Sequence, residues 1–202
     1  MIKSWDSLQI LFWSLTYILA IISAFKSKDK KSAIPLISIA LNFAWETNSV
    51  IIRLATSSRL FSVPFIGNLI WWILDAMIVI LALRSTKTKT RLFVVIFWVI
   101  ICVFLYFTFK LTSGMLISSF IIDLIMAANF LLDHSRLSNR GQRVIAVSKL
   151  LGDMFAWIAY KQEMLLINLI GIAVLTLNLI YLVVLLWDTP IMIRISGRTN
   201  PT

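Results

Sequence analysis

Seven apolar runs dominate this sequence, and each is close to the roughly 20 residues that a helix needs to cross the hydrocarbon core of a bilayer. The runs are Leu8–Phe25, Ile34–Leu54, Phe65–Leu83, Leu92–Leu111, Met115–Leu132, Val144–Tyr160 and Leu165–Trp187. Strand-type alternation of apolar and polar residues is absent, which argues against a transmembrane barrel. The sequence therefore predicts an all-α, polytopic bundle of seven transmembrane helices, and the short connections predict a single domain over residues 1–202.

The composition supports membrane insertion and excludes several classes of protein. Apolar residues make up 60% of the chain and charged residues 14%, whereas soluble domains average about 45–50% and about 25%. This balance excludes a soluble enzyme and a disordered chain, and the single Cys102 excludes a disulfide scaffold. We therefore expect the lipid bilayer as a partner, in the cytoplasmic membrane of a bacterium or the endoplasmic reticulum of a eukaryote. The sequence leaves a homo-oligomer open.

The cationic residues are distributed unequally between the two ends of the predicted helices. Fourteen follow the first, third and fifth spans or lie in the C-terminal tail: Lys26, Lys28, Lys30, Lys31, Arg84, Lys87, Lys89, Arg91, Arg136, Arg140, Arg143, Lys149, Arg194 and Arg198. Five lie at the opposite end: Lys3, Arg53, Arg59, Lys110 and Lys161. Cytoplasmic segments are enriched in Lys and Arg, which predicts an N-terminus outside and a C-terminus in the cytosol. This distribution accounts for the net charge of +10, so we expect no nucleic-acid partner. The positions of Trp5, Trp13 and Trp187 suit interfacial belts.

Carboxyl groups lie inside the predicted spans. Glu46, Asp75, Asp123 and Asp153 fall well within apolar runs, and Asp188 lies near the end of the seventh. A carboxylate at the centre of a membrane helix costs about 2.5–3.5 kcal/mol, so we expect these groups to face a shared polar interior. No Lys or Arg occupies the middle of a predicted span, so we expect the acids to lack a buried counter-ion and to be neutral. A neutral buried acid can act as a proton donor.

Polar and aromatic residues recur at helical spacing within these runs. The shared faces carry Ser38, Asn42, Glu46, Ser49 and Arg53; Asn68, Trp72 and Asp75; Ser119 and Asp123; Lys149, Asp153, Trp157 and Tyr160; and Asn178, Tyr181 and Asp188. Lipid cannot satisfy polar groups, so these faces are predicted to point into the bundle. Hydrogen bonding between helices remains an alternative role for Asn42, Asp123 and Asp153, and Asp188 can instead end its helix. Glu46 is the strongest functional candidate because it lies deepest in the richest of these faces.

Several short motifs occur in an order that resembles one known family. Residues 42–46 read NFAWE, residues 69–80 read LIWWILDAMIVI, residues 149–152 read KLLG, and Asp188 follows Tyr181 late in the seventh span. The chain resembles the small seven-helix integral-membrane terpene cyclases of fungal meroterpenoid and indole-diterpene pathways and their bacterial relatives. That resemblance implies that Glu46 and Asp188 protonate an epoxide or alkene and so start the cyclisation of a polyprenyl chain.

The residue types also suit that chemistry on physical grounds. A carbocation cascade needs an acid, a cavity that excludes water and aromatic faces that stabilise positive charge. The candidate substrate-binding residues are Asn42, Trp45, Trp72, Asp75, Asp123, Asp153, Trp157 and Tyr181. No DDxxD-type acid pair for diphosphate is present, and we expect no metal ion or other cofactor. The expected partner is a hydrophobic prenylated small molecule that enters from the lipid.

Two other functions remain open from the sequence. In a small transporter or a proton or ion channel, the intramembrane acids would line a polar path. In a non-enzymatic membrane effector or assembly subunit, the same acids would serve only to pack helices together.

Overall fold

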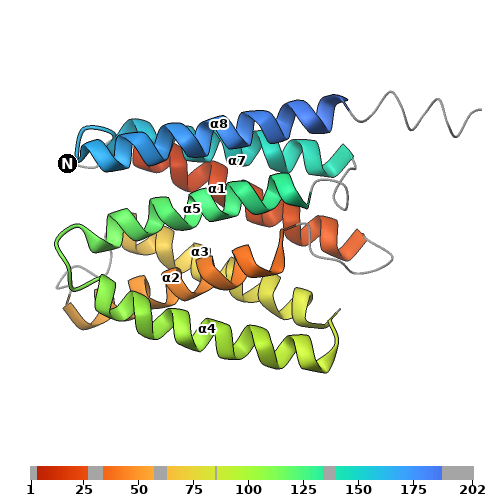
Figure 1. Cartoon of the computed structure of the whole chain (residues 1–202), viewed down its shortest axis with the longest axis horizontal. Helices are drawn as coiled ribbons and strands as arrows, with labels where there is room; N and C mark the ends of the chain where they lie inside the picture. Colours follow the sequence, from red (N-terminus) through yellow and green to blue (C-terminus); the bar gives the residue numbers. More distant parts are fainter. Residues whose placement is uncertain (1–3, 27–33, 57–62, 85, 134–139, 188–202) are drawn as a thin grey trace, which may run out of the picture.

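The structure is a computed structural model that describes residues 4–26, 34–56, 63–84, 86–133 and 140–187. These residues form seven helices and no strand. The helices are α1 (Ser4–Lys26), α2 (Leu36–Thr56), α3 (Val63–Arg84), α4 (Thr88–Thr108), α5 (Gly114–Leu132), α7 (Arg140–Tyr160) and α8 (Leu165–Trp187). Successive helices run antiparallel along the bundle (Figure 1). The prediction of an all-α, seven-helix fold is confirmed, whereas the orientation of the termini across the membrane stays a prediction.

The helices have the length of membrane spans, because 19 to 23 residues rise about 28–35 Å at 1.5 Å per residue. Five of the described helices are long and apolar enough to cross a bilayer: α1, α3, α4, α5 and α8. The other two, α2 and α7, carry buried polar side chains such as Glu46 and Lys149. Helix α7 also begins at Arg140, four residues before the predicted Val144. As a result Lys149 lies in the third turn of the helix.

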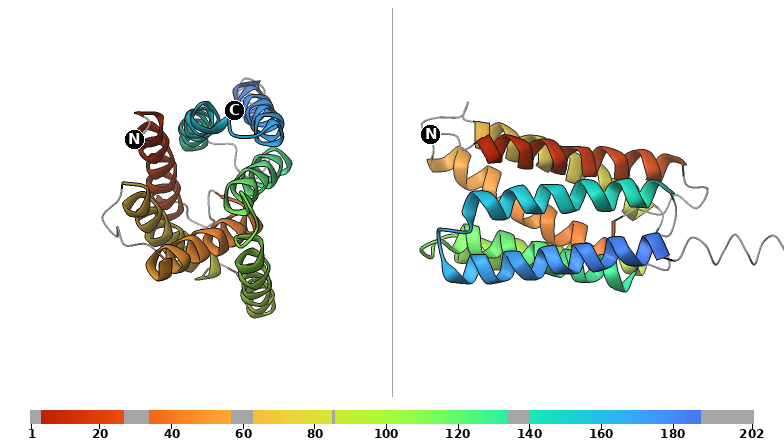
Figure 2. Two further views of the ribbon diagram at one scale, coloured as in Figure 1. Left: turned by 90° about the vertical axis from the view of Figure 1, so that its left-hand side faces the viewer. Right: turned by 90° about the horizontal axis from the view of Figure 1, so that it is seen from above.

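Six of the helices form a closed ring. Around this ring α1 packs against α3, α3 against α2, α2 against α5, α5 against α8, α8 against α7, and α7 against α1, as the view along the bundle shows (Figure 2, left). Helix α4 lies outside the ring against α2 and α5, and Val94 and Leu105 are its buried residues. The ring therefore has an interior in which side chains from α1, α2, α3, α5, α7 and α8 can meet.

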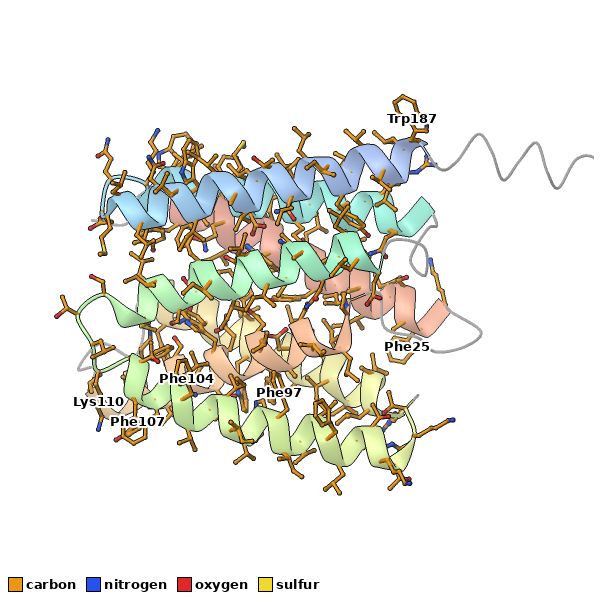
Figure 3. All side chains as sticks on the ribbon, viewed as in Figure 1. Phe25, Phe97, Phe104, Phe107, Lys110 and Trp187 are labelled. Carbon is orange, nitrogen blue, oxygen red and sulfur yellow. The ribbon has the colours of Figure 1, made fainter. Side chains whose placement is uncertain are left out.

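The outer surface of the bundle is apolar. Phe25, Phe104, Phe107 and Trp187 are each at least 60% exposed, and Phe107 and Trp187 point away from the helices that carry them (Figure 3). Soluble monomers rarely expose apolar surface on this scale. The chain is therefore an integral membrane protein whose outer face contacts lipid.

The interior of the ring differs between its two halves. In the half that contains the C-terminal ends of α1, α3, α5 and α8, an apolar core fills the space; it includes Ile21, Ile39, Ile78, Phe130, Ile145, Tyr181 and Leu185. The opposite half, which contains the N-terminal ends of α1, α3 and α5, is less completely filled and holds a cavity. The core closes this cavity toward the far end of the bundle.

Candidate active site

A cavity of about 340 Å³ lies inside the ring and is lined by residues of α1, α2, α3, α5 and α7. Its aromatic lining consists of Trp13, Tyr17, Trp45, Trp71, Phe120 and Tyr160. Its polar lining includes Asn42, Glu46, Arg53, Asn68 and Asp123. The lining thus combines acids, amides and a guanidinium with broad aromatic faces, which is the composition of a binding site for a largely apolar ligand with a few polar contacts.

Glu46 lies at the middle of α2 and lines the cavity. Its side chain is only 2% exposed, and among the described residues its Oε2 has no hydrogen-bond partner. Asp75 and Asp123 lie within electrostatic range of Glu46, as does the cation Arg53, but no ion pair joins Glu46 to a described Lys or Arg. A buried oxygen without a partner is uncommon in native proteins. It marks Glu46 as an acid with free bonding capacity at this cavity, a property that Asp6 shares through its Oδ1.

A hydrogen-bonded chain lies next to Glu46, one helical turn earlier on α2. The Asn42 amide nitrogen donates to the Tyr17 hydroxyl oxygen at 2.6 Å and to Asp75 Oδ2 at 2.6 Å, and all three residues are buried. Asp75 is not part of the cavity lining, so Asn42 connects it to the cavity. The chain links α1, α2 and α3 and holds the polar face of α2 in position.

A second buried polar cluster joins α7 to α8 and α1. Lys149 Nζ donates to Asp153 Oδ2 at 2.5 Å, and the Asn178 amide nitrogen donates to the same oxygen at 2.6 Å. The expectation that the intramembrane acids lack a buried cation is therefore wrong for Asp153. The physical reason is that Lys149 was counted with the cations after the fifth span, although it lies within the helix, where the i, i+4 spacing brings its ammonium group to Asp153.

Trp13 connects this cluster to the cavity. The Lys149 ammonium lies 5.1 Å from the centroid of the Trp13 ring, and a Cβ atom built at Gly152 would lie 2.8 Å from Trp13 Cδ1. The indole therefore packs directly on the backbone of α7. Trp13 is 5% exposed and lines the cavity, so the prediction that it belongs to an interfacial belt is wrong.

Two more of the expected binding residues, Trp45 and Asp123, also line the cavity together with Asn42. The Trp45 indole nitrogen donates to the Met115 carbonyl oxygen at 3.2 Å and to Ser118 Oγ at 3.1 Å. These bonds tie the Trp45 ring to the start of α5 and so define one wall of the cavity.

Three of the expected aromatic residues lie outside the lining. Trp72 donates to Thr47 Oγ1 at 3.1 Å and packs between α3 and α2. Trp157 donates to Asn168 Oδ1 at 2.9 Å, between α7 and α8. Tyr181 accepts a hydrogen bond of 2.9 Å from Gln142 within the apolar half of the bundle. In all three cases the polar atom bonds a neighbouring helix, which turns the ring away from the cavity.

Three acids remain among the expected site residues: Asp75, Asp153 and Asp188. Asp75 and Asp153 lie outside the lining but contact residues that connect to it, Asn42 and Lys149. Asp188 lies outside the described residues, so its distance from Glu46 stays open.

The contribution of α1 to the cavity was not predicted from the sequence. Asp6, Gln9, Trp13 and Tyr17 all line the cavity and follow the spacing i, i+3, i+7 and i+11, which places them on one face of the helix. The signal was present in the sequence as a row of polar and aromatic residues in an otherwise apolar run. Trp and Tyr side chains can face either lipid or the protein interior, whereas a carboxyl group within a span must face protein. The signal from α1 was therefore weaker than the one from the carboxyl groups.

The chain is similar to a known family of proteins. A family model described as Pyr4-like transmembrane terpene cyclases matches residues 5–131, which is more than half of the chain. The matched segment extends from the first turn of α1 to the last turn of α5 and contains Glu46, Asp75 and Asp123. Helices α7 and α8 lie beyond it. No curated protein and no solved structure matches the chain.

Proposed function

The chain belongs to the Pyr4-like transmembrane terpene cyclases, and we propose that it cyclises a prenylated substrate by proton transfer from Glu46. The observation that carries this proposal is the buried Glu46 at the cavity, whose Oε2 has no hydrogen-bond partner among the described residues. A positioned carboxylic acid in a site that excludes water is an effective general acid. Asp188 stays a predicted second acid.

The proposed reaction needs no co-reactant. The Glu46 proton moves to the oxygen of a terminal epoxide, the bond between that oxygen and the more substituted carbon breaks, and a double bond of the chain attacks the carbon. Further attacks close further rings, and the last cation loses a proton from a neighbouring carbon. The epoxide oxygen becomes a hydroxyl group, so the product is an isomer of the substrate.

The aromatic walls support the later steps of this proposal. Trp13, Trp45 and Trp71 come from three different helices and line the same cavity as Glu46. The faces of aromatic rings attract cations, and the interaction strengthens in a desolvated site to about 2 kcal/mol or more. Walls of this kind favour a migrating positive charge without offering a nucleophile that would trap it.

The family assignment favours this enzyme over the transporter or channel and over the non-enzymatic effector. The hydrogen bonds of Asp75 and Asp153 also favour the enzyme over the channel. Asp75 is bonded by Asn42 and Asp153 by Lys149 and Asn178, which suits fixed structural groups better than sites that release an ion. Proton flux through liposomes that disappears in Asp75→Asn would instead support the channel.

The test of the cyclase proposal is a conversion assay with the purified protein in detergent. An epoxide-terminated farnesyl substrate should give a cyclic product of the same mass. In D₂O, initiation at the epoxide oxygen should leave no carbon-bound deuterium, whereas initiation at an alkene should add one. A folded protein that returns unchanged substrate, or a diol that has gained one water, would contradict the proposal.

The close packing of Trp13 on Gly152 gives a prediction about the shape of the cavity. Gly152→Ala should displace the Trp13 indole, weaken binding of a prenyl ligand and change the ratio of cyclic products, in addition to an overpacking cost of about 1–3 kcal/mol. Gly171→Ala is the matched control, because a Cβ there would lie 2.3 Å from Trp157 Cδ1, outside the cavity lining. It should lower the stability alone. Ligand binding and thermal unfolding measure the two effects, and equal losses of binding in both variants would disprove the role of Trp13.

A further inference from the structure

At the outer end of the cavity, which we define by Asp6, Arg53 and Tyr160, two buried polar atoms have no hydrogen-bond partner among the described residues. Asp6 is in the first turn of α1 and Arg53 in the last turn of α2, and both line the cavity. Asp6 Oδ1 and Arg53 Nε are buried, and neither makes a hydrogen bond to another described residue. An unpartnered donor and an unpartnered acceptor in one cavity indicate a ligand that supplies both bonds.

The outer end of the cavity is separated from the proposed acid along the same helix. Arg53 follows Glu46 by seven residues, so it lies on the same face of α2 and about 10 Å farther along the axis. On the opposite side, Asp6 is held by a side-chain hydrogen bond with Tyr160 at the end of α7. The apolar side chains Ile10 and Met115 also line the cavity. The cavity therefore has two polar positions, one at Glu46 and one at Asp6 and Arg53, and an apolar surface that an apolar part of a ligand can contact.

We propose that Asp6 and Arg53 bind a polar head group of the substrate, which presents a hydrogen-bond acceptor to Arg53 Nε and a hydrogen-bond donor to Asp6 Oδ1. The two side chains carry opposite charges, so a neutral hydroxycarbonyl or amide group matches them better than a single anion. The reactive end of the bound prenyl chain then lies about 10 Å away at Glu46. This inference rests on the proposed function and extends it to the far end of the substrate.

Three probes test the proposal. They share one epoxide-terminated farnesyl chain and end in a primary amide, a methyl ester or a methyl group, which offer a donor and an acceptor, an acceptor alone, or neither. Binding is measured in a Glu46→Gln background to prevent turnover. We expect the amide to bind roughly tenfold more tightly than the ester, and the ester roughly tenfold more tightly than the methyl probe, because each step adds a bond to a charged group.

Substitutions assign the two bonds. Arg53→Met should abolish the difference between ester and methyl probes, and Asp6→Val should abolish the difference between amide and ester. Affinity for the methyl probe reports whether each variant keeps the cavity. Arg84→Met, at the exposed end of α3, is the matched control and should leave the order unchanged.

The outcomes separate this inference from the cyclase proposal. Equal affinities for the three probes, or an unchanged ester preference in Arg53→Met, would overturn the head-group site. The order of the three probes on protein with intact Asp6 and Arg53 decides this even if a substitution prevents folding. If the predicted order holds but protein with intact Glu46 converts none of the probes, the head-group site stands and the cyclase proposal fails. If all three are cyclised with the same KM, the cyclase proposal stands and the head-group site fails.

Discussion

Glu46→Gln is expected to lower the rate of cyclisation by about 10²–10⁴-fold, which is the usual contribution of a general acid. Glutamine keeps the volume and the hydrogen-bonding capacity of the side chain but has no acidic proton. The KM for the substrate should change little, because the cavity walls remain in place. The measurement is product formation under single-turnover conditions, with thermal unfolding to show that the variant is folded.

The same chemical change at another position provides the control for this result. Glu163 lies in the connection between α7 and α8 and is exposed, so Glu163→Gln should keep the wild-type rate. If Glu46→Gln cyclises the substrate as fast as Glu163→Gln, then Glu46 is not the proton donor. The acid would then have to be sought among the other carboxyl groups of the cavity.

Lys149→Met is expected to lower the free energy of unfolding by about 3–5 kcal/mol, because removal of one partner leaves the other buried charge uncompensated. Lys149 is 1% exposed and Asp153 is 3% exposed, so water cannot replace the missing ammonium group. The measurement is unfolding in mixed micelles with an increasing fraction of denaturing detergent. A loss below about 1 kcal/mol, which is the range of surface pairs, would contradict the buried ion pair.

Two further variants separate charge compensation from packing. Asp153→Asn in the Lys149→Met background removes the remaining charge and keeps an oxygen that can accept the hydrogen bond from Asn178, so it should restore most of the stability. Lys161→Met is the matched control, because the Lys161 ammonium also lies close to an indole, 5.0 Å from the centroid of the Trp157 ring, but is not part of the buried pair. It should cost no more than about 1 kcal/mol. A double variant that is no more stable than Lys149→Met alone would show that packing dominates.

The buried acids therefore divide into two groups with different chemistry. Asp153 has a cation and an amide bound to Oδ2, which suits a residue that joins helices, although its Oδ1 has no partner among the described residues. Glu46 has neither on its Oε2 and faces a volume large enough for a ligand. Lys149 also contacts the wall of the cavity, because its ammonium group lies against the ring of Trp13. Trp13 thus contacts the structural pair and lines the same cavity as Glu46.

The sequence was sufficient to predict the membrane class, the number of helices and the polar face of α2. Each of these follows from a local rule: a run of about 20 apolar residues can cross a bilayer, and polar side chains within such a run must face protein. Asn42, Glu46 and Asp123 were recognised in this way and Trp45 as a candidate aromatic face, and all four line the cavity. The ordered motifs were likewise sufficient to identify the family, which the match over residues 5–131 confirms.

Only the tertiary structure decided which faces meet. Helical spacing places a residue on a face, but the packing order of the helices and the rotation of each one about its axis depend on side chains far apart in the sequence. Trp72 and Trp157 lie on polar faces yet bond neighbouring helices, whereas Trp13 and Tyr17 come from an apolar helix and reach the cavity. Helical spacing placed Lys149 and Asp153 on one face of α7, but only the packing of α7 against α1 and α8 decided that this face is buried and that the Lys149 ammonium is 1% exposed beside Asp153.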